Sequence, residues 1–192
     1  MGVHRGEEGV SMQETAMMVQ QDGYDLYALH RSVWSAFGQK DRRDFIYTFG
    51  RTDDGVVVVV RSDCFARDWS GTVCDVGVPV EGLQAHFRLR AAPAHGRYHQ
   101  RWPENDGDRI AWLVRSAERI GCAMVRAKVL GVRKHVHKDR IPLTAVTYEG
   151  VLEVRDSALL QHALATGIGR SKAFAMGMVC LEGSMGFKLL GL

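Results

Sequence analysis

The chain has 192 residues, of which 46% are hydrophobic and 24% are charged, a composition typical of soluble globular proteins. No apolar run approaches the ~18 residues needed to cross a bilayer, and the N-terminal region lacks the apolar core of a signal peptide. The formal net charge of +3 is mildly basic, so it permits an acidic partner without requiring one.

The first half of the chain gives a weak but readable pattern. A strand is expected within residues 11–20, and apolar residues at helical spacing then predict a helix: Leu26, Leu29, Val33 and Phe37. A strand at 45–49 precedes Asp53-Asp54-Gly55, which predicts a hairpin turn into the valine run at 56–60. Residues 63–80 are ambiguous and fit one degenerate helix and a strand.

The second half begins with a strand whose two faces differ. Its apolar side chains are Leu83, Ala85, Phe87 and Leu89, and they alternate with Gln84, His86, Arg88 and Arg90. One face is therefore expected to be buried and the other strongly basic. A polar loop follows at 91–107, and apolar residues at helical spacing then predict a helix that Gly121 ends: Ile110, Leu113, Val114, Ala117 and Ile120.

The remaining elements complete a regular order. Strands are predicted at 122–130 and 143–154, with Gly150 as a bulge, then a helix at 156–166 and a strand near 174–181. The resulting order β-α-β-β-α-β is that of a ferredoxin-like domain. The sequence therefore predicts an α+β fold of two tandem ferredoxin-like (RRM-like) domains, at 1–81 and 82–183, with a short tail at 184–192.

A glycine-broken, basic loop follows the last helix, with the sequence GIGRSKAFAMGM at 167–178. Free backbone N–H groups and Lys172 suit phosphate oxygens. The loop matches neither known phosphate motif, because it lacks the phosphate-loop spacing and has Lys172 where a dinucleotide fingerprint needs its third glycine. Taken alone, the loop is more readily explained as a simple helix-to-strand connection.

Three segments, in their order and spacing, resemble one family. They are DLYALHR at 25–31 followed by Val33-Trp34 and Phe37, FRLRAAP at 87–93, and the glycine loop preceded by YEGVL at 148–152. Together they are similar to the CasE-type CRISPR repeat endoribonucleases over residues 22–182. One departure is Ala175, which stands where the family usually has glycine.

The resemblance implies a specific activity in antiviral defence. Such an enzyme cuts precursor CRISPR RNA at the base of the repeat hairpin without a metal or other cofactor. The 2′-hydroxyl preceding the scissile phosphate attacks it, leaving 2′,3′-cyclic phosphate and 5′-hydroxyl ends. The enzyme then stays on the 3′ hairpin of the crRNA as a subunit of the type I-E surveillance complex Cascade, so its partners are RNA and other Cascade subunits.

Two residues of the first helix are the expected catalytic residues. His30 suits internal transesterification, because an imidazole with a pKa near 6.5 can take the 2′ proton or protonate the leaving 5′ oxygen. Tyr27 lies three residues earlier on the same helical face, where it could orient the phosphate, supply a proton, or simply fill a domain junction. Arg31 could meet a phosphate, although a solvated charge is an equal interpretation.

The expected RNA-binding residues are basic groups in the second half. The loop at 131–140 holds four permanent cations and one acid: Arg133, Lys134, Lys138 and Arg140, with Asp139. The resemblance implies that this loop engages the hairpin stem, mainly through phosphates and shape. Further candidates are Arg88 and Arg90 on one strand face, Arg115 and Arg119 on one helix face, and Gly167, Gly169 and Lys172 in the glycine loop. The alternative for each of these cations is that it is an ordinary solvated surface charge without a role in RNA binding.

Metal binding is not indicated. His135 and His137 lack further ligands at zinc-site spacing, and the four cysteines are scattered without Cys-x-x-Cys spacing. That cysteine usage favours a reducing cytoplasm. Two interpretations besides the enzyme remain open: a subunit that binds the guide hairpin without cutting it, and a ferredoxin-like domain that binds a small metabolite. The second explains neither the basic loop nor the arginine strand.

Overall fold

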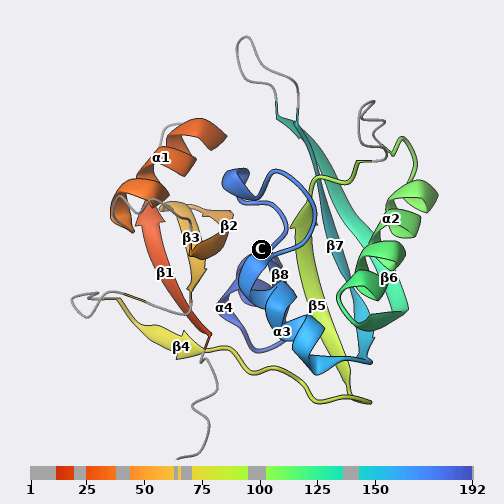
Figure 1. Ribbon diagram of the computed structural model, residues 1–192. Coiled ribbons are helices and arrows are strands. Elements are labelled where there is room, and N and C mark those ends of the chain that lie inside the picture. The colour runs from red at the N-terminus through yellow and green to blue at the C-terminus, as the bar shows by residue number, and fades with distance from the viewer. Residues whose placement is uncertain are drawn as a thin grey trace, which may run out of the picture.

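The computed structural model describes residues 12–19, 25–37, 44–62, 65, 71–94, 103–135 and 143–191. Figure 1 shows two antiparallel four-stranded sheets, each with helices packed on it. The strand orders are β2-β3-β1-β4 and β6-β7-β5-β8. In both sheets the first strand of the unit lies between the third and the fourth, as in ferredoxin-like domains. The predicted α+β fold is therefore confirmed.

The first sheet and its helix follow the predicted order. They comprise β1 (Gln13–Val19), α1 (Leu26–Ala36), β2 (Phe45–Thr52), β3 (Gly55–Ser62) and β4 (Val73–Asp75). The predicted hairpin turn is present, because Thr52 pairs with Gly55 and Gly55 has φ of 141°, which a residue with a side chain rarely adopts. The strand expected within 63–80 is β4, and most of residues 63–70 lie outside the described part of the chain.

The second sheet carries the remaining elements. They are β5 (Gln84–Ala91), α2 (Asp106–Arg119), β6 (Cys122–His135), β7 (Leu143–Val154), α3 (Ser157–Thr166), the single 3-10 turn η1 (Lys172–Phe174), β8 (Val179–Leu181) and α4 (Met185–Leu189). The Asp156 carboxylate caps α3, and Gly167 ends it with φ of 72°. No helix in the described ranges is long and apolar enough to span a membrane.

Two details of β6 and β7 differ from the prediction. β6 continues to His135, five residues into the segment expected to be a loop, because it keeps pairing with β7 beyond Gly131. The irregularities lie in β6, around Val125 and Leu130, and not at Gly150 in β7. Gly150 is required there for packing, since a side chain would collide with the Arg126 carbonyl.

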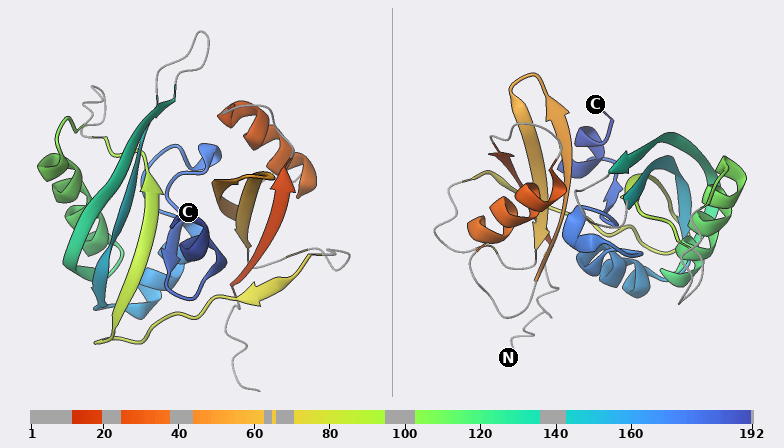
Figure 2. Two further views of the ribbon diagram at one scale, coloured as in Figure 1. Left: turned by 180° about the vertical axis from the view of Figure 1, so that it is seen from behind. Right: turned by 90° about the horizontal axis from the view of Figure 1, so that it is seen from above.

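Both faces of the first sheet are buried. One face packs under α1, where Leu29 and Val33 join an apolar core with the inward side chains of β2 and β3. The opposite face, which includes Ile46 and Val59, packs against β8 and the buried Leu189 at the end of α4. Figure 2 shows α4 between the two sheets. The valine run of β3 is thus continuous because it faces a core on both sides.

Helix α4 corrects one expectation. For residues 184–192 the sequence predicts only a short tail. In the structure Ser184 caps a five-residue helix, and the side chain of Leu189 at the end of this helix is buried. The helix lies against β2, so close that an added side chain at Gly50 would collide with Leu189. It was missed because a helix of this length shows no apolar periodicity.

A buried ion pair joins the two sheets. The Arg61 guanidinium on β3 contacts the Glu14 carboxylate on β1 at 2.6 Å, and both side chains are at most 1% exposed. Arg61 also donates to the carbonyl oxygens of Leu164 in α3 and Val179 in β8, at 2.9 and 2.8 Å. The second Glu14 oxygen accepts the backbone N–H of Met185 at 2.8 Å. This pair, here called the Glu14–Arg61 clamp, ties the first sheet to α3, β8 and α4.

Candidate functional site

Helix α1 presents the two predicted catalytic side chains. The Asp25 carboxylate accepts the backbone N–H of Tyr27 at 2.8 Å, which fixes the start of the helix as an N-cap. Tyr27 and His30 follow three residues apart, so they share a face, and both are half-buried. Arg31 is exposed on the same helix.

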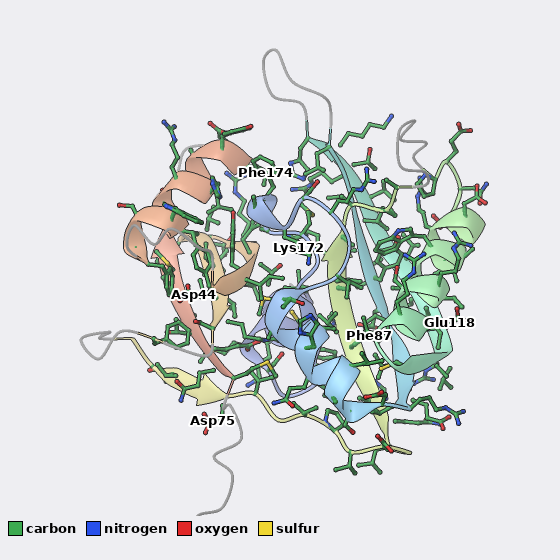
Figure 3. All side chains as sticks on the ribbon, in the orientation of Figure 1. Asp44, Asp75, Phe87, Glu118, Lys172 and Phe174 are labelled. Carbon is green, nitrogen blue, oxygen red and sulfur yellow. The ribbon has the colours of Figure 1, made fainter. Side chains whose placement is uncertain are left out.

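The glycine loop meets this face of α1. The Phe174 ring, in η1, lies with its centroid 4.9 Å from that of Tyr27 and 6.0 Å from that of His30. The hydroxyl of Tyr47, on β2, donates to the Ala173 carbonyl at 2.5 Å. Figure 3 shows Phe174 beside α1, with Lys172 on the neighbouring part of the loop. The structure therefore brings Tyr27 and His30 together with the loop that carries Lys172, although they lie far apart in the sequence.

The loop has a specific backbone conformation. Ser171 and Ala175 have φ of 60° and 62°, the left-handed region that glycine adopts more readily. Glycine would adopt this φ at position 175 more readily than alanine does. The departure from the family pattern at Ala175 therefore falls at a position where the backbone favours glycine. The loop is closed by a hydrogen bond from the Ile168 N–H to the Gly177 carbonyl at 2.8 Å, and the Gly177 N–H donates to the Arg90 carbonyl at 2.7 Å. These two hydrogen bonds close the loop and fix it to β5.

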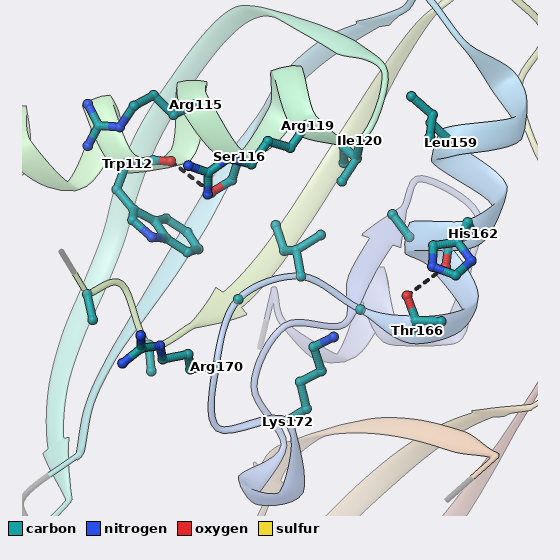
Figure 4. A pocket seen from close by; sticks show the side chains of 16 residues that line it. Trp112, Arg115, Ser116, Arg119, Ile120, Leu159, His162, Thr166, Arg170 and Lys172 are labelled. Carbon is teal, nitrogen blue, oxygen red and sulfur yellow. Dashed lines mark hydrogen bonds between the residues drawn. The ribbon is translucent and has the colours of Figure 1, made fainter. Parts of the chain in front are cut away.

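A basic groove extends from the loop between α2 and α3, with a volume of about 850 Å³. Its basic lining residues are Arg115, Arg119, His162, Arg170 and Lys172, and its described lining includes no Asp or Glu. Figure 4 shows α2 along one side of the groove, α3 on the other, and Arg170 and Lys172 at the loop. This is the feature named here the α2–α3 groove.

The two strand arginines are held by protein groups. Arg88 is ion-paired with Glu149 at 2.7 Å and donates to the Phe187 carbonyl of α4 at 2.9 Å. Arg90 donates to the Phe49 carbonyl of β2 at 2.5 Å and lies over the Phe49 ring. Arg88 therefore anchors α4, and Arg90 bridges the two sheets. A role for either in RNA binding stays a prediction.

A smaller basic hollow lies where β2, α4 and the end of β6 meet. Its volume is about 290 Å³, and its lining includes Arg51, Arg90, Arg133 and His135. Burial lowers the pKa of His135, and the charges of Arg133 and Arg90 lower it further. Arg133 and Lys134 are exposed at the end of β6, whereas the predicted RNA-binding residues at 138 and 140 lie outside the described residues.

Sequence reasoning missed four groups at this site. Phe174 and Tyr47 shape the contact between loop and helix, and His162 and Arg170 complete the α2–α3 groove. Arg170 could have been found by its place in the loop. The others depend on contacts between distant segments, which no local pattern reports. Within the part of the chain that the structure describes, no cluster of His, Cys, Asp and Glu could hold a metal ion.

The chain is similar to known proteins over most of its length. Residues 9–182 match the family model described as CRISPR associated protein. The structure of Thermus thermophilus Cse3 bound to an RNA representing a pre-cleavage complex aligns with a TM-score of 0.76 at 22% identity, covering 89% of this chain and 98% of that one. The CRISPR-associated protein Cas6e from Escherichia coli str. K-12 aligns with a TM-score of 0.71 at 21% identity, covering 88% and 98%.

A chain of a CRISPR RNA-guided surveillance complex aligns less closely, with a TM-score of 0.61 at 19% identity and coverage of 88% and 98%. At these identities, structural similarity establishes the shared fold. No curated protein matches the sequence.

Proposed function

Because this chain belongs to the family of CRISPR associated proteins, we propose that it is an endoribonuclease that cuts precursor CRISPR RNA at the base of the repeat hairpin. The structural relatives include CRISPR endoribonuclease Cse3 bound to a 19-nucleotide RNA and Thermus thermophilus Cse3 bound to an RNA that represents a pre-cleavage complex. The observation that carries the proposal is the contact of Tyr27 and His30 with the glycine loop. That contact supports the proposal, because a histidine and a tyrosine lie next to a loop that carries a lysine.

The proposed reaction needs only RNA and protein groups. The 2′-hydroxyl preceding the scissile phosphate loses its proton as its oxygen attacks phosphorus. The bond from phosphorus to the 5′ oxygen breaks, and that oxygen gains a proton, which leaves 2′,3′-cyclic phosphate and 5′-hydroxyl ends. His30 takes the first proton or gives the second, since a neutral imidazole is a base and its protonated form an acid near neutral pH.

The neighbouring groups act on the phosphate. The Tyr27 hydroxyl orients it by donating a hydrogen bond, and Lys172 offsets the negative charge that grows on its oxygens in the transition state. Because these steps use proton transfer and fixed charge, the proposal includes no metal ion. The first unit, residues 1–81, then supplies the catalytic helix, and the second, residues 82–183, supplies the loop and most of the basic surface.

The proposal extends to the product. The enzyme stays on the 3′ hairpin of the crRNA and joins a Cascade complex in the cytoplasm, with other Cascade subunits as partners. Arg133 and Lys134, exposed at the end of β6, are proposed to contact phosphates of the stem together with Lys138 and Arg140. A relative in a surveillance complex supports this assembly.

The test is cleavage of the cognate repeat RNA by purified protein in EDTA. We expect wild-type protein to cut it, and His30→Ala to lower the single-turnover rate by at least ~10²-fold, because positioned proton transfer contributes about 10²- to 10⁴-fold. A matched control is His86→Ala, which removes an exposed histidine of β5 and should cut at the wild-type rate. RNA that is bound but never cut by the wild type would favour a hairpin-binding subunit without catalysis. Wild-type cleavage by His30→Ala would refute the catalytic assignment.

A further inference from the structure

Two basic side chains of the α2–α3 groove have no protein partner among the described residues. The side chains of Arg119 and His162 have no hydrogen bond or ion pair with any group that the structure describes, and both are exposed. They stand on opposite walls, on α2 and α3. With five basic residues and no acid in its described lining, the groove is complementary to a chain of negative charges.

The groove also has apolar surface between its charged walls. Leu159, which is 46% exposed, and the half-buried Ile120 line it, together with the largely buried ring of Trp112 (Figure 4). The Trp112 ring is stacked on the Tyr148 ring, with the two ring centroids 6.1 Å apart. Gly169 keeps the loop close to this ring, because an added side chain would lie within 3.2 Å of it.

This combination distinguishes between two forms of RNA. An A-form stem hides its base edges and is bound through its phosphates and shape. Single strands are bound by a positively charged groove that follows the backbone together with aromatic and apolar surfaces on which the bases lie. The α2–α3 groove has both components. Its volume of about 850 Å³ is that of a small-molecule pocket, so it suits a few nucleotides rather than a duplex.

The groove ends on the same loop that meets the proposed cleavage site. Lys172 lines the end of the groove, and Phe174, two residues further, contacts His30. A single strand leaving the base of a hairpin held at His30 would therefore enter the groove directly.

We propose that the α2–α3 groove binds the single-stranded RNA next to the base of the repeat hairpin, with phosphates on Arg119 and His162 and bases against Leu159 and Ile120. This proposal rests on the proposed function for the position of the hairpin. The groove's preference for single-stranded RNA rests on its own lining. The strand could leave the stem on its 5′ or its 3′ side, and the experiment separates these.

The experiment measures dissociation constants by fluorescence anisotropy for full-length protein. All hairpins carry a 2′-deoxynucleotide before the scissile phosphate, which removes the nucleophile. The RNAs are the hairpin alone, the hairpin with a 5′ flank, the hairpin with a 3′ flank, and an unstructured oligouridylate. The variant is Arg119→Gln combined with His162→Gln, and the control is Arg126→Gln, an exposed arginine of β6 outside the groove lining.

We expect one flank to tighten wild-type binding by about tenfold or more, since one hydrogen bond to a charged group contributes about that factor. The double variant should lose this gain, and the control should keep it. The log–log salt slope for the flanked RNA should fall by about 0.7 for each phosphate contact removed. A gain that survives in the double variant, or an equal loss of affinity for the hairpin alone, would overturn the proposal.

The oligouridylate separates this proposal from the proposed function. If wild-type protein neither binds nor cuts the hairpin, the proposed function fails. In that case, oligouridylate that binds the wild type and not the double variant would still support the groove as a single-strand site. Equal oligouridylate binding by the two proteins would refute it.

Discussion

His135 is a residue whose protonation depends on its surroundings. It is the last residue of β6 and is half-buried in the small hollow. Burial lowers the pKa of its imidazole, and the neighbouring Arg133 and Arg90 lower it further. The folded protein therefore binds a proton at this position only at a lower pH than the unfolded chain does.

This difference makes a prediction about stability. Below pH ~6.5 the unfolded chain protonates His135 before the folded protein does, so stability is lost as the pH falls from there through the folded pKa. Above pH ~6.5 both states are neutral and His135 adds no pH dependence. The slope is at most about 1.4 kcal/mol per pH unit, reduced where solvent screens the charges.

We therefore expect His135→Gln to lose less stability than wild type between pH 7.5 and 5.5, as measured by chemical denaturation at each pH. Gln keeps a polar side chain of similar size and cannot be protonated in this range. Parallel pH profiles for the two proteins would show that His135 titrates as it does in the unfolded chain.

At the scale of elements, the glycine loop is the segment whose shape matters most for the proposed site. Its two ends meet through the bond between Ile168 and Gly177, and its middle contacts α1 through Phe174. Gly177 has φ of 89°, and an added side chain would collide with the Ile168 carbonyl.

Gly177→Ala should therefore destabilise the loop by about 1–3 kcal/mol, the usual range for such backbone strain, and more if the carbonyl cannot move. Gly82→Ala is the matched control, because Gly82 has φ of 81° but open space around it. We expect thermal unfolding to show a larger loss for Gly177→Ala, together with slower cleavage. Equal losses in both variants would mean that only the backbone angle matters.

The sequence predicts elements that local chemistry determines. The helix over 156–166, the turn at Gly55 and the glycine loop that begins at 167 were all identifiable, because each depends on neighbouring residues. Helix α4 was missed because five residues are too few to show apolar periodicity, and its buried contacts are with the distant first sheet. The extension of β6 past Gly131 was missed because pairing with β7 outweighs a local break.

The candidate site was predictable in part for the same reason. His30 and Tyr27 could be placed on one helical face, and the glycine loop could be recognised by its composition. Their meeting through Phe174 could not be derived from spacing, since it joins segments from the two sheets. Arg88 illustrates a different kind of miss. The sequence places it on a basic strand face, but in the structure its guanidinium is bound by the Glu149 carboxylate and by a backbone carbonyl of α4.

For the whole molecule, the Glu14–Arg61 clamp determines how the two sheets are joined. A buried ion pair of this kind gains little over an apolar pair, but losing one partner leaves an unpaired buried charge. Here Arg61 also satisfies backbone carbonyls of α3 and β8, and Glu14 satisfies a backbone N–H of α4, so the polar contacts cannot be replaced by packing alone.

Arg61→Met should therefore lower the free energy of unfolding by about 3–5 kcal/mol. The double variant Glu14→Met with Arg61→Met should also be destabilised, because it strands the carbonyls of Leu164 and Val179 and the Met185 N–H. Arg155→Met, which breaks the exposed pair with Glu153, should cost less than about 1 kcal/mol. Denaturation curves test all three. A double variant as stable as wild type would mean that the clamp contributes nothing beyond its own charges.

The position of α4 has a consequence for the order in which the protein folds during its synthesis. The last strand of the first sheet ends at Asp75, but one face of that sheet, including Ile46 and Val59, is covered by Leu189 of α4. The ribosome adds about 5–20 residues per second, so the covering helix is made roughly ten seconds after the sheet. The nascent first half must keep an apolar face exposed for that interval, and it completes its core only when the C-terminal segment arrives.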